Sequence, residues 1–478
     1  MKKQYGQFTI ICPAGSGGFG AIYAVVREGD SKAYILKTLK KVDPTTREIE
    51  LFKKEIDIIN ILNKDPRNDS IPILYYYDKN NIPPSLPYFV IDFYSKGNLY
   101  LYLKQQKYFL SERHAKVIFK KIVKAIESCH SKNICHFDIK PGNIVFNKNY
   151  EPIIIDFGLA DIYKESNSEL IAFTNGRGTD NYKSPEMWGT NPFYGVKCDI
   201  FSLGVLLFNL VTKKIGFYKS KDDPYYIKII NGENNNYSEY WDIIKNGIDN
   251  FEKLSENFKK LYISMVAYNP DNRPTIEEIL KSDWLKEINN LTSQENDILE
   301  KEVKNELNKI YEEIQEDNGL NIVEGLNFLG YETRCKKEGI FKNKNIKPKK
   351  FQNDSLNINP FIKINGKLDE VEFMNCLGNE ILTEIKGSNI QRTNKKDLKY
   401  DFIIEKKEES KQEEEEENEE EAEEEKEIVE CKMEIELFEF EKGGYILEFL
   451  RTEGDIQKFY DYFFKIKEII KKMIKNCS

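Results

Sequence analysis

A glycine-rich turn is the first feature with residue types suited to phosphate chemistry. Residues 15–20 read Gly-Ser-Gly-Gly-Phe-Gly, between the β-branched segments Phe8–Ile11 and Ile22–Val26. Glycine permits tight turns on steric grounds alone, so this pattern is weak evidence by itself. A dinucleotide-binding fingerprint would need a helix directly after the glycines, whereas a strand-like segment follows. We predict a hairpin whose backbone N–H groups approach nucleotide phosphates. The residues expected to form it are Ala14, Gly15, Ser16, Gly17, Gly18, Phe19, Gly20 and Ile22.

A lysine and a glutamate downstream could complete a phosphate site. Lys37 is expected to end a strand that begins at Tyr34, and Glu55 lies in an amphipathic segment. A single lysine is most often a solvated surface charge. A Lys37–Glu55 ion pair would instead hold the ammonium group against the α- and β-phosphates. Glu48 and Glu50 compete for this role, but only Glu55 is followed by the apolar spacing expected of the helix.

The strongest signal is a pair of motifs further along the chain. His-Phe-Asp-Ile-Lys-Pro-Gly-Asn spans residues 136–143, and Asp156-Phe157-Gly158 follows. These motifs resemble those of eukaryotic protein kinases of the serine/threonine type, over about residues 5–287. Later landmarks keep the family's order and spacing, which makes a chance match negligible. They are Gly178-Thr179, Tyr182–Glu186, Asp199–Gly204 and Asn272–Pro274.

The resemblance implies an α+β, bilobal protein kinase fold with a β-rich N-lobe and an α-rich C-lobe. It implies a non-specific serine/threonine kinase that uses ATP and Mg²⁺ to phosphorylate protein substrates. Asp138 would orient the substrate hydroxyl and accept its proton, while Asn143 and Asp156 would ligate Mg²⁺ as hard oxygen donors. Lys140 would steady the γ-phosphate, and a lysine here is typical of serine/threonine kinases. Thr179 would help to hold the peptide substrate.

The resemblance also implies a hinge between the lobes at Tyr88–Tyr94. Ile91 would be the gatekeeper of the adenine pocket, and backbone groups of Asp92 and Tyr94 would bond to adenine. An ordinary buried strand is the other interpretation, and the two are compatible because a hinge uses backbone groups. Val145 would also contact the nucleotide.

Three positions depart from the family's pattern. Phe137 replaces the arginine that usually precedes the catalytic aspartate and pairs with a phosphate on the activation loop. We therefore expect activity that depends little on loop phosphorylation, for which Thr174 is the best-placed site and Arg177 an alternative acceptor. Ile35 replaces a small alanine and should tighten the adenine pocket, and Ser184 replaces another alanine. None of these changes removes a catalytic group. The alternative hypothesis is a catalytically weak pseudokinase scaffold that acts through its C-terminal domain, but a pseudokinase typically lacks one of Lys37, Asp138 or Asp156, and all three are present.

The elements that must position these groups change from strands to helices along the chain. Apolar spacing predicts helices over Thr46–Leu62, Glu112–His130 and Ile200–Val211. Glu186 and Arg273 would form a buried ion pair that braces the larger lobe, and such a pair stabilises only while both partners remain.

Length and composition limit the number of domains and the classes of protein that the chain can belong to. The chain has 478 residues, which suggests about three units, and 40% hydrophobic residues exclude wholesale disorder. Residues 413–427 carry a local charge of −11, so the rest of the chain sums to about +2 and gives no argument for nucleic-acid binding. The eight cysteines form no C-x-x-C pair, which favours free thiols in a reducing, cytoplasmic setting. We expect no signal peptide or transmembrane segment, because the longest apolar run, Ile200–Thr212, is too short.

The predicted domains are a kinase domain at 5–287, a helical and basic linker at 288–357 and a small α+β domain at 358–478. A capping box at Thr292 and Glu295 predicts a helix in the linker. Its apolar residues at helical spacing are Leu299, Val303, Leu307, Ile310 and Ile314. Residues 408–428 are predicted to be a disordered acidic insertion, because a run of glutamates repels itself.

The last domain resembles the kinase-associated domain of relatives of the AMP-activated and calcium/calmodulin-dependent kinases. The expected elements are a helix at Glu372–Ile381, strands at Lys399–Ile404, Met433–Phe440 and Tyr445–Leu450, and a final helix with Phe459, Phe463, Ile466 and Ile470 on one stripe. The stripe is interpreted as core rather than as a binding face.

That resemblance implies binding to anionic phospholipid, as a peripheral membrane protein, or restraint of the kinase domain. The basic residues suited to either role are Arg392, Lys395, Lys396 and Lys399. A solvated charged loop is an equally good interpretation. If the domain restrains the kinase, truncation after about residue 290 should raise activity.

Overall fold

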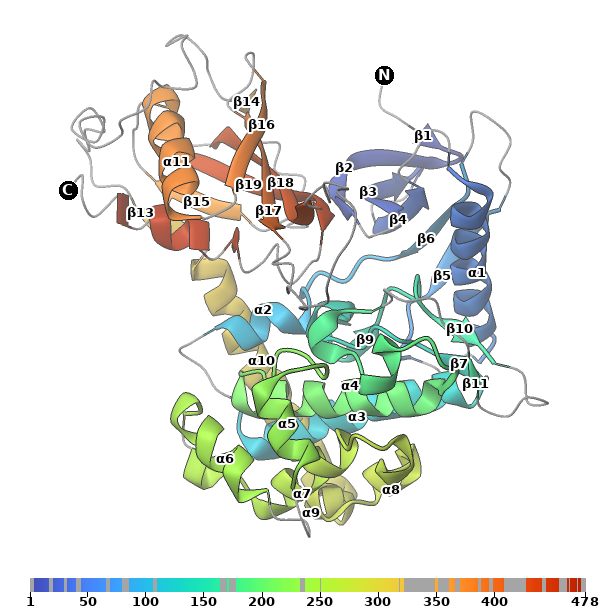
Figure 1. The fold of residues 1–478 in the computed structure, drawn as a ribbon. Coiled ribbons are helices and arrows are strands. Elements are labelled where there is room, and N and C mark those ends of the chain that lie inside the picture. Colours follow the sequence, from blue (N-terminus) through green and yellow to red (C-terminus); the bar gives the residue numbers. More distant parts are fainter. Residues whose placement is uncertain are drawn as a thin grey trace, which may run out of the picture. The chain divides into compact units, whose positions relative to one another are not determined.

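Figure 1 shows the fold of the computed structural model. The chain divides into two compact units. One unit is Tyr34–Ile314, and the other combines Met1–Ala33 with Gln315–Ser478. The structure describes residues 4–16, 20–29, 32–39, 44–65, 69–79, 86–105, 110–163, 170–171, 178–232, 237–249, 251–317, 319–321, 349–350, 361–365, 370–385, 388–394, 399–407, 427–440, 444–454, 462–463, 465–470 and 472–473.

The N-terminal strands form the hairpin that the glycine pattern predicts. Strands β1 (Gln4–Tyr5), β2 (Phe8–Ser16) and β3 (Gly20–Arg27) run antiparallel, and Ser16 pairs with Ala21 across the turn. A strand and not a helix therefore follows the glycines, so the dinucleotide-binding alternative is excluded. Strand β2 extends beyond the predicted Phe8–Ile11 and includes two register shifts. Gly17, Gly18 and Phe19 lie outside the described residues.

The unit Tyr34–Ile314 begins with an antiparallel sheet and one long helix. Strands β4 (Ala33–Leu39), β6 (Tyr88–Asp92) and β5 (Leu74–Asp78) pair in that order. Helix α1 (Thr46–Leu62) has the predicted bounds and begins at a capping box formed by Thr45 and Glu48. The helix packs on the sheet through Phe52, whose ring centroid lies 5.5 Å from that of Phe89. Lys37 lies inside β4 and not at its end, because the strand continues to Leu39.

The rest of this unit is mainly helical. Helices α3 (Glu112–His130) and α4 (Gly195–Thr212) lie side by side within one apolar core (Figure 1). Among the described helices, α4 is long and apolar enough to cross a membrane, but 83% of it is buried inside the protein, as in a core helix. At Gly204 an added Cβ would lie 2.8 Å from the Cβ of Met265, so the glycine permits close approach of α4 to α7 (Glu256–Met265).

Shorter elements complete the unit. The other helices are α2 (Leu99–Lys104), α5 (Pro224–Ile230), α6 (Ser238–Ile244), α8 (Ile276–Leu280) and α9 (Asp283–Asn289). The other strands are β7 (Ile134–Cys135), β8 (Ile144–Phe146), β9 (Pro152–Ile154), β10 (Asp161–Ile162), β11 (Leu170–Ile171) and β12 (Phe193–Tyr194). They form three two-stranded antiparallel pairs, β8 with β9, β7 with β10, and β11 with β12.

Helix α10 (Ser293–Asp317) lies in the stretch predicted to be a linker. The predicted capping box is confirmed, since Glu295 N–H donates to Thr292 Oγ1 and Thr292 N–H donates to Glu295 Oε2. The predicted apolar stripe faces the protein interior, and its members belong to the same core as α3 and α4. The buried residues are Leu299, Val303, Leu307, Ile310 and Ile314. This helix is therefore an integral part of the unit Tyr34–Ile314.

The described residues of the C-terminal region form one sheet, one long helix and a last helical stretch at 462–463, 465–470 and 472–473. The sheet order is β13 (Gly319–Asn321), β15 (Phe361–Asn365), β19 (Gly444–Gly454), β18 (Glu427–Phe440), β17 (Lys399–Lys407) and β16 (Ser388–Asn394), with β14 (Lys349–Lys350) paired to β18. Helix α11 (Glu370–Glu384) includes the predicted helix, and the three predicted strands are present. Phe463, Ile466 and Ile470 are buried, as expected of core residues.

The structure describes only some of the charged residues of this region. Arg392 lies on β16 directly opposite Asp401 of β17, and Lys399 begins β17. Lys395, Lys396 and residues 408–426 lie outside the described residues, as does Phe459.

Candidate active site

A buried lysine joins two carboxylates that come from different elements. Lys37 Nζ on β4 lies 2.7 Å from Glu55 Oε1 on α1 and 2.8 Å from Asp156 Oδ1 beyond β9. The predicted Lys37–Glu55 pair is therefore present. Burial opposes charge on Lys37, but the two carboxylates outweigh it and raise the pKa of its ammonium group. In the same way, Lys37 overcomes the effect of burial and holds the pKa of Asp156 below its usual range. The centre thus keeps one cation beside an ionised carboxylate.

The backbone around Asp156 is tight. Asp156 has φ of 64°, in the left-handed region that few non-glycine residues adopt. A Cβ added at Gly158 would lie 3.3 Å from Asp156 Oδ1 and 3.7 Å from Lys37 Nζ. Glycine at this position therefore leaves room for the lysine and carboxylate to meet.

The second cluster surrounds Asp138, and it brings together four residues that the sequence singled out. Asp138 Oδ1 accepts hydrogen bonds from Thr179 N–H at 3.0 Å and from Thr179 Oγ1 at 2.7 Å. Its Oδ2 accepts a bond from Asn143 Nδ2 at 2.8 Å and lies 3.2 Å from Lys140 Nζ. Lys140 also donates to Thr179 Oγ1. Both carboxylate oxygens are held, so the orientation of Asp138 is fixed by its neighbours.

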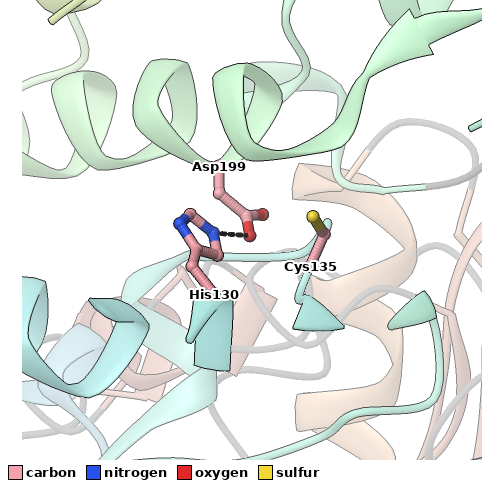
Figure 2. A group of neighbouring side chains, drawn as sticks. All are labelled: His130, Cys135 and Asp199. Carbon is pink, nitrogen blue, oxygen red and sulfur yellow. Dashed lines mark hydrogen bonds and ion pairs between the residues drawn. The ribbon is translucent and has the colours of Figure 1, made fainter. Parts of the chain in front are cut away.

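A buried carboxylate on α4 anchors the backbone that carries Asp138. Asp199 accepts hydrogen bonds from the N–H groups of His136 at 2.9 Å and Phe137 at 2.8 Å. Figure 2 shows that the ring of His130 also bonds to Asp199, at 2.9 Å, and that Cys135 lies beside them. The sequence interpretation named Asp199 only as part of a motif and did not predict this role.

The same three side chains have the atom types of a metal site. The ligand atoms of His130, Cys135 and Asp199 all lie within 4.8 Å of one another. However, both oxygens of Asp199 are already engaged by backbone N–H groups, and burial raises the pKa of the Cys135 thiol well above its usual value. Because a thiol must ionise to bind a metal, we assign this cluster to anchoring of the backbone segment that carries Asp138.

Phe137, which replaces the expected arginine, belongs to a small apolar cluster. Its side chain is buried with Met187 and Phe193, and its φ of 62° lies in the left-handed region. A Cβ added at Gly178 would lie 2.9 Å from the carbonyl oxygen of Phe137, so the chain before Thr179 passes directly over this residue. The sequence predicted the missing cation but not the apolar contact that occupies its place.

The predicted ion pair of the larger lobe is confirmed. Arg273 Nη1 lies 2.6 Å from Glu186 Oε1, and Nη2 donates to Glu186 Oε2 at 2.8 Å. Arg273 Nε donates to the carbonyl oxygen of Ala267 at 2.8 Å, and its side chain is fully buried. Burial opposes ionisation of Glu186, but Arg273 outweighs this effect and lowers the pKa of the carboxyl group.

The predicted hinge residues lie at and beyond the end of β6. Asp92 is the last residue of β6, and Tyr94 lies in the connection that follows, just before a turn at Ser95 and Lys96. Val145 of β8 forms a backbone bridge with Asn98, four residues after Tyr94. Residues 14–16, 20 and 22 of the glycine-rich hairpin belong to the other compact unit and are described with it.

Comparisons with known proteins agree on one family. The family model described as "Protein kinase domain" matches residues 8–285. Similar curated proteins include the serine/threonine-protein kinase PSK2 of Saccharomyces cerevisiae, 27% identical over 296 residues (59% of this chain, 24% of that protein). The probable serine/threonine-protein kinase MARK-A of Dictyostelium discoideum is 29% identical over 283 residues (59% and 24%). Calcium-dependent protein kinase 25 of Arabidopsis thaliana is 27% identical over 300 residues (60% and 51%). The chain thus spans about a quarter to a half of the length of these relatives.

Proposed function

The chain belongs to the protein kinase family, and from this premise we propose that it transfers the γ-phosphoryl group of ATP to hydroxyl groups of protein substrates. The observation that carries the proposal is the carboxylate of Asp138, which Thr179 and Asn143 hold through both of its oxygens. A carboxylate fixed in this way can accept a proton from a hydroxyl group placed beside it.

The donor set near Asp138 fits a magnesium nucleotide. Among the described residues, the side-chain amide of Asn143 donates its hydrogens to Asp138. Its side-chain oxygen, Oδ1, therefore stays available as a hard ligand. Asp156 remains ionised and would supply the second protein ligand, while Lys37 would neutralise phosphate charge. Bound Mg²⁺-ATP would supply the phosphoryl group and the cation that offsets its charge.

The roles of the chain's own residues follow from their contacts. Asp138 would orient the acceptor hydroxyl and take up its proton at a carboxylate oxygen. Lys140, beside Asp138 and Thr179, would offset negative charge as the phosphoryl group transfers. Thr179 would hold both Asp138 and the adjacent peptide. Such a site acts chiefly by positioning and charge neutralisation, which these fixed contacts provide.

Serine and threonine are the proposed acceptors. Lys140 lies two residues after Asp138, as in the serine/threonine kinases that the sequence resembles. Several similar proteins carry "serine/threonine-protein kinase" in their names, which supports the same choice.

We further propose that the C-terminal region is a regulatory domain of the kinase-associated type. Support comes from helix α11, the antiparallel run β16–β17–β18–β19 and the buried stripe of the last helix. Its role would be to restrain the kinase or to bind anionic phospholipid.

A radiolabelled ATP assay on the full-length protein tests the main proposal. Generic basic proteins and a serine/threonine peptide library would serve as substrates. Asp138→Asn should abolish labelling, while Asp242→Asn, at an exposed carboxylate on α6, should not. Labelling no greater than that of Asp138→Asn, in a protein that still binds nucleotide, would favour the pseudokinase scaffold.

A further inference from the structure

Helix α10 contacts the kinase core with charged groups as well as with its apolar stripe. In its first half, Glu300 pairs with Lys121, and Glu302 lies 3.8 Å from Arg113, both partners on α3. In its second half, Asn308 accepts a hydrogen bond from the hydroxyl of Tyr150 at 2.6 Å. The two halves therefore contact different parts of the core.

Tyr311, in the second half of α10, contacts Ser95 and Lys96. Its hydroxyl donates a hydrogen bond to the carbonyl oxygen of Ser95 at 3.2 Å. Its ring faces Lys96, whose Nζ lies 4.1 Å from the ring centroid. The ring of Tyr150 lies on Lys96 as well, at 4.8 Å, so the ammonium group is held between two aromatic rings.

Ser95 and Lys96 directly follow Tyr94, the last residue of the expected hinge. Their carbonyl oxygens are held by separate elements, that of Ser95 by Tyr311 and that of Lys96 by the hydroxyl of Tyr102 on α2, at 2.9 Å. The next carbonyl, of Gly97, accepts a bond from Phe146 N–H on β8 at 2.9 Å. Three consecutive carbonyl groups are thus fixed, and the first is fixed from a helix beyond the family match at 8–285.

We propose that Tyr311 is a positioning residue for the nucleotide site, acting through Ser95 and Lys96 on the hinge backbone. The proposal rests on the proposed function, because it assumes that residues 92–94 bond to adenine. When the residues directly after the hinge are held in place, the hinge loses less conformational freedom as it binds the nucleotide. The affinity for nucleotide therefore rises without a new contact to it. The chemistry at Asp138 should be unaffected.

The test uses full-length protein and three variants. Tyr311→Leu removes the hydroxyl bond and the ring, and Tyr311→Phe removes the bond alone. Glu300→Gln is the matched control, because it weakens a contact of the same helix that involves neither Ser95 nor Lys96. We would measure kcat and KM for ATP, the Kd for ADP by calorimetry, and amide hydrogen exchange of residues 93–98 without nucleotide.

Tyr311→Leu should raise KM for ATP and Kd for ADP about fivefold, with kcat unchanged, because it loses both the hydrogen bond to Ser95 and the ring contact to Lys96. Tyr311→Phe should have a smaller effect and Glu300→Gln none. Exchange at 93–98 should quicken in Tyr311→Leu. If Tyr311→Leu does not fold, Lys96→Met removes the ammonium–ring contact from the hinge side and Tyr311→Phe removes the hydrogen bond to Ser95.

Three results would overturn the proposal. Unchanged KM and Kd with a lower melting temperature would leave Tyr311 with a structural role alone, and a fall in kcat at constant KM would place its effect elsewhere. Hydrogen exchange of residues 93–98 is measured without nucleotide, so it tests the contact of Tyr311 with the hinge independently of whether the protein binds ATP. Quickened exchange in a protein that binds no ADP would sink the proposed function but keep the contact to the hinge, whereas unchanged exchange would sink the inference itself.

Discussion

The ring of Phe137 lies edge-on to the ring of Phe193, with the two centroids 6.4 Å apart. Phe137 belongs to the segment that carries Asp138, and Phe193 belongs to β12, where it pairs with Ile171 of β11. The segment that carries Asp138 is therefore connected, through the ring of Phe193 and the backbone pairing of Phe193 with Ile171, to the stretch Asp156–Glu186 that corresponds to the activation loop of kinases. In kinases with an arginine at this position, that connection uses a phosphate.

The first prediction is that activity does not require loop phosphorylation. Phosphatase treatment and Thr174→Ala should each leave specific activity essentially unchanged, because the apolar contact does not depend on charge. Specific activity towards a peptide substrate is the measurement. A large loss in both experiments would show that another basic residue binds a phosphate in place of the missing arginine.

The second prediction concerns the ring of Phe137 itself. Phe137→Ala should lower the free energy of unfolding by about 3–5 kcal/mol, as for other buried aromatic residues, and should reduce activity. Phe137→Leu keeps most of the apolar volume and serves as the control in denaturant unfolding. Equal stability of the alanine and leucine variants would mean that the ring contact contributes little.

The third prediction tests the lysine centre. Lys37→Met and Asp156→Asn should each lower kcat/KM on the order of a hundredfold or more, since charge neutralisation supplies much of the catalysis. Circular dichroism should show an unchanged fold. Lys64→Met, at an exposed lysine after α1, is the control and should keep full activity. Wild-type turnover in Asp156→Asn would contradict the enzymatic assignment.

The fourth prediction is a pH dependence that comes from Glu186. Because Arg273 lowers the pKa of this carboxyl group in the folded protein, the pair stabilises fully above the ordinary value near 4.5 and loses its contribution as pH falls through the lower, folded value. Glu186→Gln should cost about 3–5 kcal/mol at pH 7 and give a shallower loss of stability below pH 4.5. Urea unfolding between pH 3 and 7 would measure both effects. Parallel pH curves for the two proteins would refute the linkage.

The fifth prediction is that the C-terminal region can be removed after Asp317 but not after residue 290. Truncation after residue 290 would remove α10 and expose the core surface that its stripe covers, where each buried leucine or isoleucine contributes about 1.5–3 kcal/mol. That protein should be unstable and inactive. Truncation after Asp317 keeps the helix and should raise activity if the C-terminal region restrains the kinase. Thermal unfolding and peptide phosphorylation of both truncated proteins would decide.

Local motifs account for what could be predicted. The strand and helix around Lys37 and Glu55 predict their pairing, while the roles of Asp138 and Asn143 are implied by the resemblance of residues 136–143 to kinase motifs. Tyr311 could not be recognised, because its partner Ser95 lies 216 residues away in sequence. Its helix was predicted from apolar periodicity, but periodicity does not say which surface the apolar stripe covers.

The same reasoning explains the other residues that the sequence did not assign. Asp199 acts through backbone N–H groups, which every non-proline residue carries, so no residue type signals the partner. Phe137 departs from a pattern, and a departure shows what is lost without showing that Met187 and Phe193 fill the place.

The burial of α10 also has a consequence for synthesis of the chain. A ribosome completes residues 5–287 before it reaches the helix that finishes the core, and at about 5–20 residues per second this leaves a delay of a few seconds. During that interval the nascent chain exposes the apolar surface that Leu299, Val303 and Leu307 later cover. We therefore expect the unit Tyr34–Ile314 to finish folding only after a segment beyond its last family motif has been synthesised, and we expect chaperones to bind the exposed intermediate.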